Sequence, residues 1–257
     1  MLWVPGPRYL LRRYCIMRLI CALPQRGRVL EIGCGTGDLL LDLTKRGFTG
    51  VGVESGQTAR NEAFERTRRV RHRVSIVADL EQVDEQFDLL VACEVLEHTE
   101  DDRAALTVWV EKLSPGGSLI LSVPAHQNRW GPSDVWAGHF RRYERGELWQ
   151  LVTDVGMNVQ TLWCYGFPLA NMGEPLRHFL HARRLKRQAK LSFAQRTALS
   201  GIERSRLEFV LALMPMPLIL PFCWIQVPFF DTDFGNGLIV LGQRPRLGNT
   251  AVNSTCS

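Results

Sequence analysis

Two carboxylates and a histidine, Glu94, Glu97 and His98, stand within five consecutive residues of this sequence. Their spacing would place all three on one face if the segment formed a helical turn. His139 follows further along, in the run Gly138-His139-Phe140-Arg141-Arg142-Tyr143. Carboxylate oxygens and imidazole nitrogens bind hard and borderline divalent metals, so these four side chains are a candidate metal site.

Three interpretations of this cluster are open. A divalent ion such as Mg²⁺ or Mn²⁺, held by the four side chains, would lower the pKa of a bound hydroxyl and fix its orientation. Without a metal, His98 or His139 could take a proton as a base, because imidazole has an unperturbed pKa of about 6.5. The acid and histidine groups could also serve only to hold a loop, and His126 could replace His139 as the fourth ligand.

A second chemical feature is the glycine-rich run V-L-E-I-G-C-G-T-G at residues 29–37. It is an apolar strand with an acid, Glu31, followed by three glycines at alternate positions, which let the backbone turn sharply and approach a ligand closely. A helix beginning near Thr36 would point free N–H groups at that ligand. The dinucleotide fingerprint G-x-G-x-x-G requires glycine at position 38, where this chain has Asp38, so the spacing predicts a different nucleotide cofactor.

The following segments predict the strands of an open α/β sheet. Residues 50–54 form a short strand closing on Glu54, whose carboxylate suits the two hydroxyls of a ribose. Residues 74–80 form a strand ending at Asp79 and Leu80. The remaining predicted elements are a strand over 87–93, a helix end, Pro-Gly-Gly turn and strand over 113–124, a helix over 144–155, and strands over 158–165 and 237–243.

The run E-x-G-x-G-x-G, with these segments after it in order, resembles the class I S-adenosylmethionine-dependent methyltransferases. The resemblance covers roughly residues 28–165 and implies an α/β fold with a seven-stranded Rossmann-like sheet. It implies S-adenosylmethionine as cofactor, with Asp79 at the adenine amino group and Leu80 beside the ring. The cofactor-binding residues it implies are Glu31, Gly33, Cys34, Gly35, Gly37, Glu54, Ser55, Asp79, Leu80 and Cys93.

Parts of the acid and histidine run are shared with narrower groups. E-x-x-E-H with a later histidine is similar to the metal site of small-RNA 3′-terminal 2′-O-methyltransferases. E-V-L-E-H is similar to the ubiquinone-biosynthesis O-methyltransferases, which act on a catechol. H-F-R-R-Y resembles a bacterial subset found with genes for glycans or lipid-linked intermediates, and the acceptor-pocket residues proposed beside it are Trp130, Asp134, Trp136 and Arg141.

These resemblances imply O-methylation of a small-molecule, sugar or lipid-linked acceptor, with or without metal assistance. Two alternatives stay open. One is RNA 3′-terminal 2′-O-methylation, and the other is a catalytically silent cofactor-binding adaptor. The first would show as a steeply salt-dependent affinity for RNA, and the second as cofactor binding without product.

Charge is unevenly distributed along the chain. Residues 1–30 carry six arginines and no acid, residues 177–206 carry nine basic residues and one acid, and residues 31–176 hold 22 acidic and 14 basic residues. The two basic elements predict an anionic partner such as a membrane surface, although solvated arginine-rich helix faces would give the same pattern. The acidic body and the lack of a recognised RNA-binding module argue against nucleic acid.

Composition predicts a cytoplasmic enzyme with one catalytic domain, since 46% of the residues are hydrophobic. Arginines interrupt the apolar positions of the first segment, which predicts an amphipathic helix within residues 1–27 rather than a signal peptide. The seven cysteines are odd in number and scattered, so we expect reduced thiols. Residues 247–257 are predicted to be a loose tail.

Residues 166–236 form an insertion between the sixth strand and the last strand segment, residues 237–246. Its uncharged stretch, residues 209–230, is long enough to span a bilayer. The seventh strand must return to the same sheet, however, and prolines interrupt the stretch at Pro215, Pro217, Pro221 and Pro228. We therefore predict a lid, a homodimer surface or a peripheral contact with the inner face of the membrane.

Overall fold

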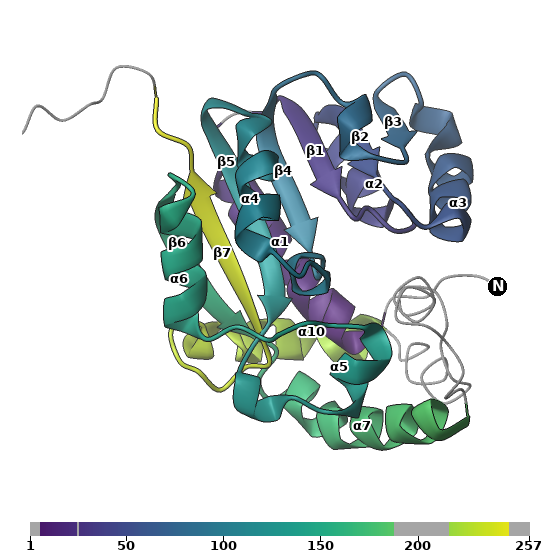
Figure 1. Cartoon of the computed structure of the whole chain (residues 1–257), viewed down its shortest axis with the longest axis vertical. Helices are drawn as coiled ribbons and strands as arrows, with labels where there is room; N and C mark the ends of the chain where they lie inside the picture. Colours follow the sequence, from purple (N-terminus) through teal and green to yellow (C-terminus); the bar gives the residue numbers. More distant parts are fainter. Residues whose placement is uncertain (1–5, 25, 188–215, 247–257) are drawn as a thin grey trace, which may run out of the picture.

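The computed structural model of the chain is built on a seven-stranded sheet with helices on both faces (Figure 1). It describes residues 6–24, 26–187 and 216–246. The strand order is β3-β2-β1-β4-β5-β7-β6, and β7 runs antiparallel to both of its neighbours. The predicted α/β fold with a Rossmann-like methyltransferase sheet is confirmed.

Strands and helices alternate in the first half of the chain, as parallel sheets with crossover helices require. Its main elements are α1 (Pro7–Ala22), β1 (Arg28–Ile32), α2 (Asp38–Thr44), β2 (Thr49–Val53), α3 (Gln57–Thr67), β3 (Val74–Val77), β4 (Phe87–Cys93), α4 (Asp102–Glu111) and β5 (Leu113–Pro124). The predicted Pro-Gly-Gly turn lies inside β5, where Gly116 has a φ of +82°. The pairing register between β4 and β5 shifts there, so the segment bends without leaving the sheet.

The second half supplies the other edge of the sheet and the helices beside its carboxyl end. Its main elements are α5 (Pro132–Ala137), α6 (Arg145–Asp154), β6 (Asn158–Tyr165), α7 (Leu169–Arg187), α10 (Met216–Ile225) and β7 (Gly237–Gln243). Strands β4, β6 and β7 have the bounds that the sequence predicted. In Figure 1, α1, α5, α7 and α10 gather at the end of the sheet to which the β4 arrow points.

The sheet separates two hydrophobic cores, because strands buried on both faces carry apolar residues at successive positions. On one face, Leu106 of α4 and Leu148 of α6 pack against β1, β4, β5 and β7. On the other face, Leu11 of α1, Leu40 of α2 and Ile219 of α10 are fully buried. Helix α10 therefore packs beside α1 on the sheet, although it comes from the insertion.

Helix α1 is the predicted N-terminal helix, and three of its four arginines, Arg8, Arg12 and Arg13, pair with the protein's own carboxylates. Arg8 forms an ion pair with Glu94 at 2.8 Å, and Arg13 pairs with Asp42. Arg18 lies over the ring of Trp163. Three of the basic residues for which the sequence predicted an external anionic partner thus have carboxylate partners within the protein.

The insertion is described in part, as α7 and α10. Pro175 lies inside α7 and Pro221 inside α10, so the expectation that Pro221 would interrupt a helix was wrong. Among the described residues, no helix is long and apolar enough to cross a bilayer. The apolar residues 209–215, the basic residues 188–206 and the predicted tail, residues 247–257, lie outside the described part of the chain.

Candidate active site

The glycine-rich loop lies at the carboxyl end of β1, where Ile32 is paired with Ala92 of β4. Gly33, Gly35 and Gly37 have φ values of +67°, +54° and +76°, a region that favours glycine. A Cβ on Gly33 would overlap the side chain of Val95, so the loop packs directly against the acid and histidine run. A Cβ on Gly35 would meet no atom within 4 Å. The loop therefore presents an open surface at Gly35.

Glu54 is fixed beside that surface. One of its carboxylate oxygens accepts a hydrogen bond from the backbone N–H of Gly35 at 2.9 Å, and the other from Gly56 at 2.8 Å. Arg60 donates to the backbone carbonyls of Glu54 and Ser55, both at 2.8 Å. Because a carboxylate oxygen can accept a second hydrogen bond, Glu54 still has room for the two hydroxyls of a ribose.

Asp79 and Leu80 lie beyond the end of β3, the edge strand next to β2. The Asp79 side chain is the N-cap of the 3₁₀ turn Leu80–Gln82. Leu80 packs partly against the core. The sheet thus brings Glu54 and the glycine loop into contact and places Asp79 on the neighbouring strand end; the roles of these residues toward a cofactor stay predictions.

Buried acidic and thiol groups line the inner side of the loop. Glu31 is 4% exposed, and its Oε2 has no hydrogen-bond partner. Burial, together with the nearby Asp38, raises the pKa of this carboxyl well above its usual range. Burial also raises the pKa of the Cys34 thiol and brings that of Cys93 to about 12. Both thiols are therefore protonated. The Glu31 carboxyl can accept a hydrogen bond from a ligand, and a cationic group of that ligand would favour its ionised form.

Glu97, His98 and His139 come together as predicted, with one potential ligand atom of each lying within 4.8 Å of the others. The Nε2 atom of His139 is 3.8 Å from Oε1 of Glu97. Glu97 is fully buried, and neither carboxylate oxygen has a hydrogen-bond partner. Burial, reinforced by the charge of Glu94, raises the pKa of Glu97 well above its usual range. Such a group needs a proton, a metal or a ligand to satisfy it.

Glu94 lies outside this three-residue set. The predicted single helical turn is wrong, because Glu94 has a φ of +57° and only Leu96–His98 form a 3₁₀ turn. The Glu94 carboxylate pairs with Arg8 and accepts a hydrogen bond from the Tyr165 hydroxyl at 3.2 Å. Although burial opposes it, Arg8 and then Arg12 lower the pKa of Glu94 to about 2. Arg8 and Arg12 of α1 thus already balance the charge of Glu94, and the sequence did not predict this pairing.

Asp134 orients His139. Oδ1 of Asp134 lies 3.0 Å from Nδ1 of His139, and because a carboxylate only accepts, Nδ1 carries the proton. Arg142, itself 3% exposed, donates to both oxygens of Asp134 at 2.9 Å. Although burial opposes it, these hydrogen bonds hold the pKa of Asp134 well below its usual range. The Nε2 lone pair of His139 is left facing the buried Glu97.

His98 is a less suitable base. Its Nδ1 lies 3.3 Å from the carbonyl oxygen of Gly138, so Nδ1 is the donor. Burial, with His139 as the second cause, lowers the pKa of His98 to about 4. The neutral ring is therefore a weak base near neutral pH, although neutral imidazole is the form that binds metals.

The other predicted residues divide between the site and the scaffold. His126 lies apart, with Nδ1 3.2 Å from Glu144, so it is not the alternative fourth ligand. Trp136 is buried at 1% exposure, and Arg141 pairs with Asp102 at 3.0 Å. Of the four residues predicted for an acceptor pocket, Asp134 is the one whose contacts link it to the histidine cluster.

A family model described as "Methyltransferase domain" matches residues 8–162, which is more than half of the chain. The chain belongs to this family of class I S-adenosylmethionine-dependent methyltransferases. The match includes α1 as well as the glycine loop and His139, and it ends before α7. The insertion therefore lies outside the family match, as do the last residues of β6 and the whole of β7.

Among curated proteins, the chain is similar to the ubiquinone biosynthesis O-methyltransferase of Cereibacter sphaeroides. The two are 35% identical over 109 residues, which are 40% of this chain and 44% of the relative. The protein of the same name from Rickettsia bellii is 32% identical over 98 residues, 37% of this chain and 40% of the relative. The chain thus spans less than half of the length of the curated relatives that it matches.

Solved structures resemble the methyltransferase over nearly its whole length. The [4+2]-cyclase SpnF has a TM-score of 0.60 at 16% identity, covering 93% of this chain and 82% of its own. Phosphoethanolamine N-methyltransferase 2 of Haemonchus contortus, in complex with S-adenosyl-L-methionine, has a TM-score of 0.58 at 14% identity, covering 91% of this chain and 53% of its own. At these identities the likeness shows the fold alone, and a cyclase among the neighbours shows that the fold does not fix the reaction.

Proposed function

We propose that this methyltransferase transfers the methyl group of S-adenosylmethionine to a hydroxyl oxygen of a small-molecule acceptor. The observation that carries the proposal is the imidazole of His139, which Asp134 holds with Nε2 free, beside a turn that packs on the glycine loop. The relatives named O-methyltransferase support oxygen as the acceptor atom. A sugar or a lipid-linked molecule is the narrower acceptor class that we propose.

The described residues fit the cofactor. The open surface at Gly35, the Glu54 carboxylate beside it and the unpartnered oxygen of Glu31 would hold a nucleoside with a cationic amino acid end. Bound there, the cofactor supplies a methyl group on a sulfonium sulfur, which an oxygen nucleophile displaces in line. The protein must therefore align the two molecules, exclude water and remove the proton of the acceptor.

His139 would remove that proton. An acceptor hydroxyl placed at Nε2 loses its proton to the ring as the oxygen becomes bonded to carbon, and the imidazolium is stabilised by the ionised Asp134. Arg142 keeps Asp134 in place through two hydrogen bonds. Glu97, protonated because of its burial, can donate a hydrogen bond to the acceptor without adding a competing negative charge.

Metal assistance is the alternative use of the same residues. Glu97, His98 and His139 offer three ligand atoms, which leaves positions for an acceptor oxygen on a bound ion. Mg²⁺ or Mn²⁺ would then lower the pKa of the acceptor hydroxyl, and Glu97 would be ionised. Glu94 would be a fourth ligand only if it exchanged its contact with Arg8.

One titration separates these cases. We expect purified protein to bind S-adenosylhomocysteine in a calorimeter, and elemental analysis of the same sample to give its metal content. About one Mg or Mn per chain, lost in Glu97→Ala with S-adenosylhomocysteine binding retained, would establish metal assistance. A metal-free protein that binds S-adenosylhomocysteine would leave His139 as the base, and failure to bind it would overturn the proposed function.

The two alternative functions that the sequence left open predict different experimental results. RNA 3′-terminal methylation would show as RNA binding that weakens steeply with salt, because phosphate contacts release counterions. The arginines of α1 are already paired with Glu94 and Asp42, which leaves that helix less charge for RNA. A silent adaptor would bind S-adenosylhomocysteine but methylate no acceptor in a screen of phenols, sugars and lipid-linked substrates.

We also propose that α10 contacts the inner face of a membrane. Leu218 and Trp224 are 56% and 69% exposed on this uncharged helix, and Arg183 and Lys186 lie on α7 at the same end of the sheet (Figure 1). Exposed tryptophan beside basic residues suits an anionic bilayer surface.

Vesicle sedimentation tests that contact. We expect phosphatidylglycerol vesicles to bind the protein more than phosphatidylcholine vesicles do, and Trp224→Ala to reduce binding several-fold. Trp149→Ala is the matched control, because Trp149 is 46% exposed on α6. Equal binding by wild type and Trp224→Ala would contradict the proposal, and a dimer lost in Trp224→Ala would assign this surface to a second copy.

A further inference from the structure

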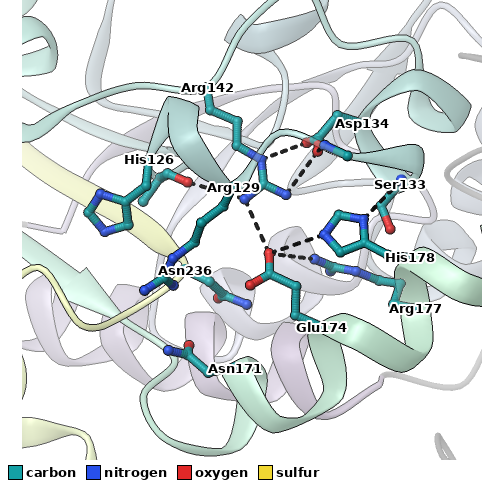
Figure 2. Close-up of polar contacts among 12 residues, drawn as sticks. His126, Arg129, Ser133, Asp134, Arg142, Asn171, Glu174, Arg177, His178 and Asn236 are labelled. Carbon is teal, nitrogen blue, oxygen red and sulfur yellow. Dashed lines mark hydrogen bonds and ion pairs between the residues drawn. The ribbon is translucent and has the colours of Figure 1, made fainter.

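A cluster of charged residues continues from Asp134, the partner of His139, through Arg142 and Glu174 into the insertion (Figure 2). Arg142, which holds Asp134 on one side, donates to Oε1 of Glu174 at 3.1 Å on the other. The same oxygen lies 3.7 Å from Arg177 and 3.8 Å from His178, both on α7. Glu174 is thus the point where the active-site network meets α7.

A second branch of the network leads from Arg142 to α1. Arg142 donates to the backbone carbonyl of Ala125 at 3.3 Å, and the Ala125 N–H donates to the carbonyl of Asn236 at 3.2 Å. Arg8 donates to the same carbonyl of Asn236 and pairs with Glu94. Two branches therefore start at Arg142, one ending at Arg177 and the other at Arg8.

In this network the guanidinium groups outnumber the carboxylates that they contact. Four guanidinium groups, those of Arg8, Arg12, Arg142 and Arg177, share three carboxylates, those of Glu94, Asp134 and Glu174. A site with more guanidinium groups than carboxylates favours an anion as a further partner.

Arg177 and Arg8 carry that surplus. Glu174 already receives the shorter contact from Arg142, which leaves Arg177 a pairing distance of 3.7 Å. The Nε atoms of Arg177 and Arg8 are both buried and have no hydrogen-bond partner. The two side chains are 26% and 24% exposed, so a ligand entering the site can reach them.

Asn236 adds a neutral donor at the same place. It is 1% exposed, and neither side-chain amide atom has a hydrogen-bond partner. Its backbone carbonyl accepts from Arg8 at 3.5 Å, which places it beside that guanidinium. Two buried guanidinium N–H groups and an amide N–H are thus unsatisfied in one region of the site.

We infer that Arg177 and Arg8 form a subsite for an anionic group, a phosphate or a carboxylate, that the acceptor carries at a distance from its methylated hydroxyl. The inference rests on the proposed function, because the subsite opens on the same network as His139. Planar guanidinium groups bind the oxygens of both anions through paired N–H donors, whereas an uncharged acceptor would leave them unsatisfied. In that case α1 and α7, which carry Arg8 and Arg177, determine the preference for a charged acceptor, and the residues around the glycine loop do not.

The test uses three probes of matched shape: phenyl phosphate, benzoate and phenol. Each is titrated into full-length protein saturated with S-adenosylhomocysteine. We expect wild type to bind one anion at least about tenfold tighter than phenol, and Arg177→Gln to lose that preference, since a charged hydrogen-bond pair is worth a factor of that size. Which of the two anions binds distinguishes a phosphate-bearing from a carboxylate-bearing acceptor.

Arg103→Gln is the matched control, because it removes the same charge from a side chain that is 57% exposed and pairs with Asp154 on the surface. It should bind the anions as wild type does. Equal anion affinity in wild type and Arg177→Gln, or no preference for an anion over phenol in wild type, would overturn the inference.

Measuring the binding of S-adenosylhomocysteine to the same variants separates a failure of the subsite from a failure of the proposed function. Failure of wild type to bind it contradicts the proposed function, whereas loss of anion preference with its binding intact contradicts the subsite alone. Where Arg177→Gln no longer binds S-adenosylhomocysteine, Arg177→Lys takes its place. Lysine keeps the charge without the paired donors, so intermediate affinity is expected and wild-type affinity counts against the inference.

Discussion

Gly35→Leu is expected to abolish binding of S-adenosylhomocysteine while the protein stays folded. A Cβ at this position meets no atom within 4 Å, so a leucine side chain would extend into the open surface beside Glu54, where we propose that the cofactor binds. The φ of +54° adds a backbone cost of about 1–2 kcal/mol, which a protein of this size tolerates. Calorimetry should show affinity reduced by at least about a hundredfold, or about 2.7 kcal/mol.

Gly156→Leu is the control for that experiment. Gly156 has a φ of +83° and equally open surroundings, but it lies in the turn between α6 and β6. The variant should lose a similar amount of stability and keep wild-type affinity for S-adenosylhomocysteine. If Gly35→Leu binds as tightly as Gly156→Leu does, the glycine loop is not the cofactor site.

His139→Asn should lower kcat for methyl transfer by about a hundredfold to ten-thousandfold, the usual contribution of a positioned base. The acceptor for this measurement comes from a screen with methyl-labelled S-adenosylmethionine. Affinity for S-adenosylhomocysteine should not change, because the contacts of His139 are to Glu97, Asp134 and His98 and not to the glycine loop. The effect would therefore fall on the chemical step.

His126→Asn supplies the matched control for the histidine. His126 is also buried, at 6% exposure, but its ring lies against Glu144 and Cys164. Its φ of +65° is one that asparagine accepts, so the change should be tolerated. A His139→Asn enzyme with wild-type kcat would remove His139 from the reaction. A fall in kcat accompanied by loss of bound metal would reassign it as a ligand.

Charge compensation by α1 explains why the turn that carries Glu97 and His98 differs from the pattern in its sequence. Spacing alone grouped Glu94 with Glu97 and His98, but the ion pair with Arg8 takes Glu94 into a contact with α1. As a result one acid is ionised and the other is protonated, although they are three positions apart. Two carboxyl groups with opposite protonation are a frequent feature of catalytic sites.

By itself, the sequence determined the cofactor half and the sheet. Strands buried on both faces need continuous apolar residues, so β4 and β7 could be placed to the residue. The edge strand β6, which is half exposed, also has the predicted bounds. The glycines of the loop are required by their backbone geometry at φ values between +54° and +76°. Strand burial and loop backbone geometry constrain residues that are close together in the sequence, so a short sequence pattern is enough to predict them.

Only the tertiary structure decided which charges meet. The pairing of Arg8 with Glu94, of Asp134 with His139, and of Arg142 with Glu174 joins segments that no periodicity relates. The sequence does not show whether an arginine on a helix faces water or a buried acid. It therefore predicted external anions for α1, and it did not predict that Arg177 would lie in the active-site network. Burial sets the energy of these contacts, and burial depends on how α1, α5 and α7 pack at the end of the sheet.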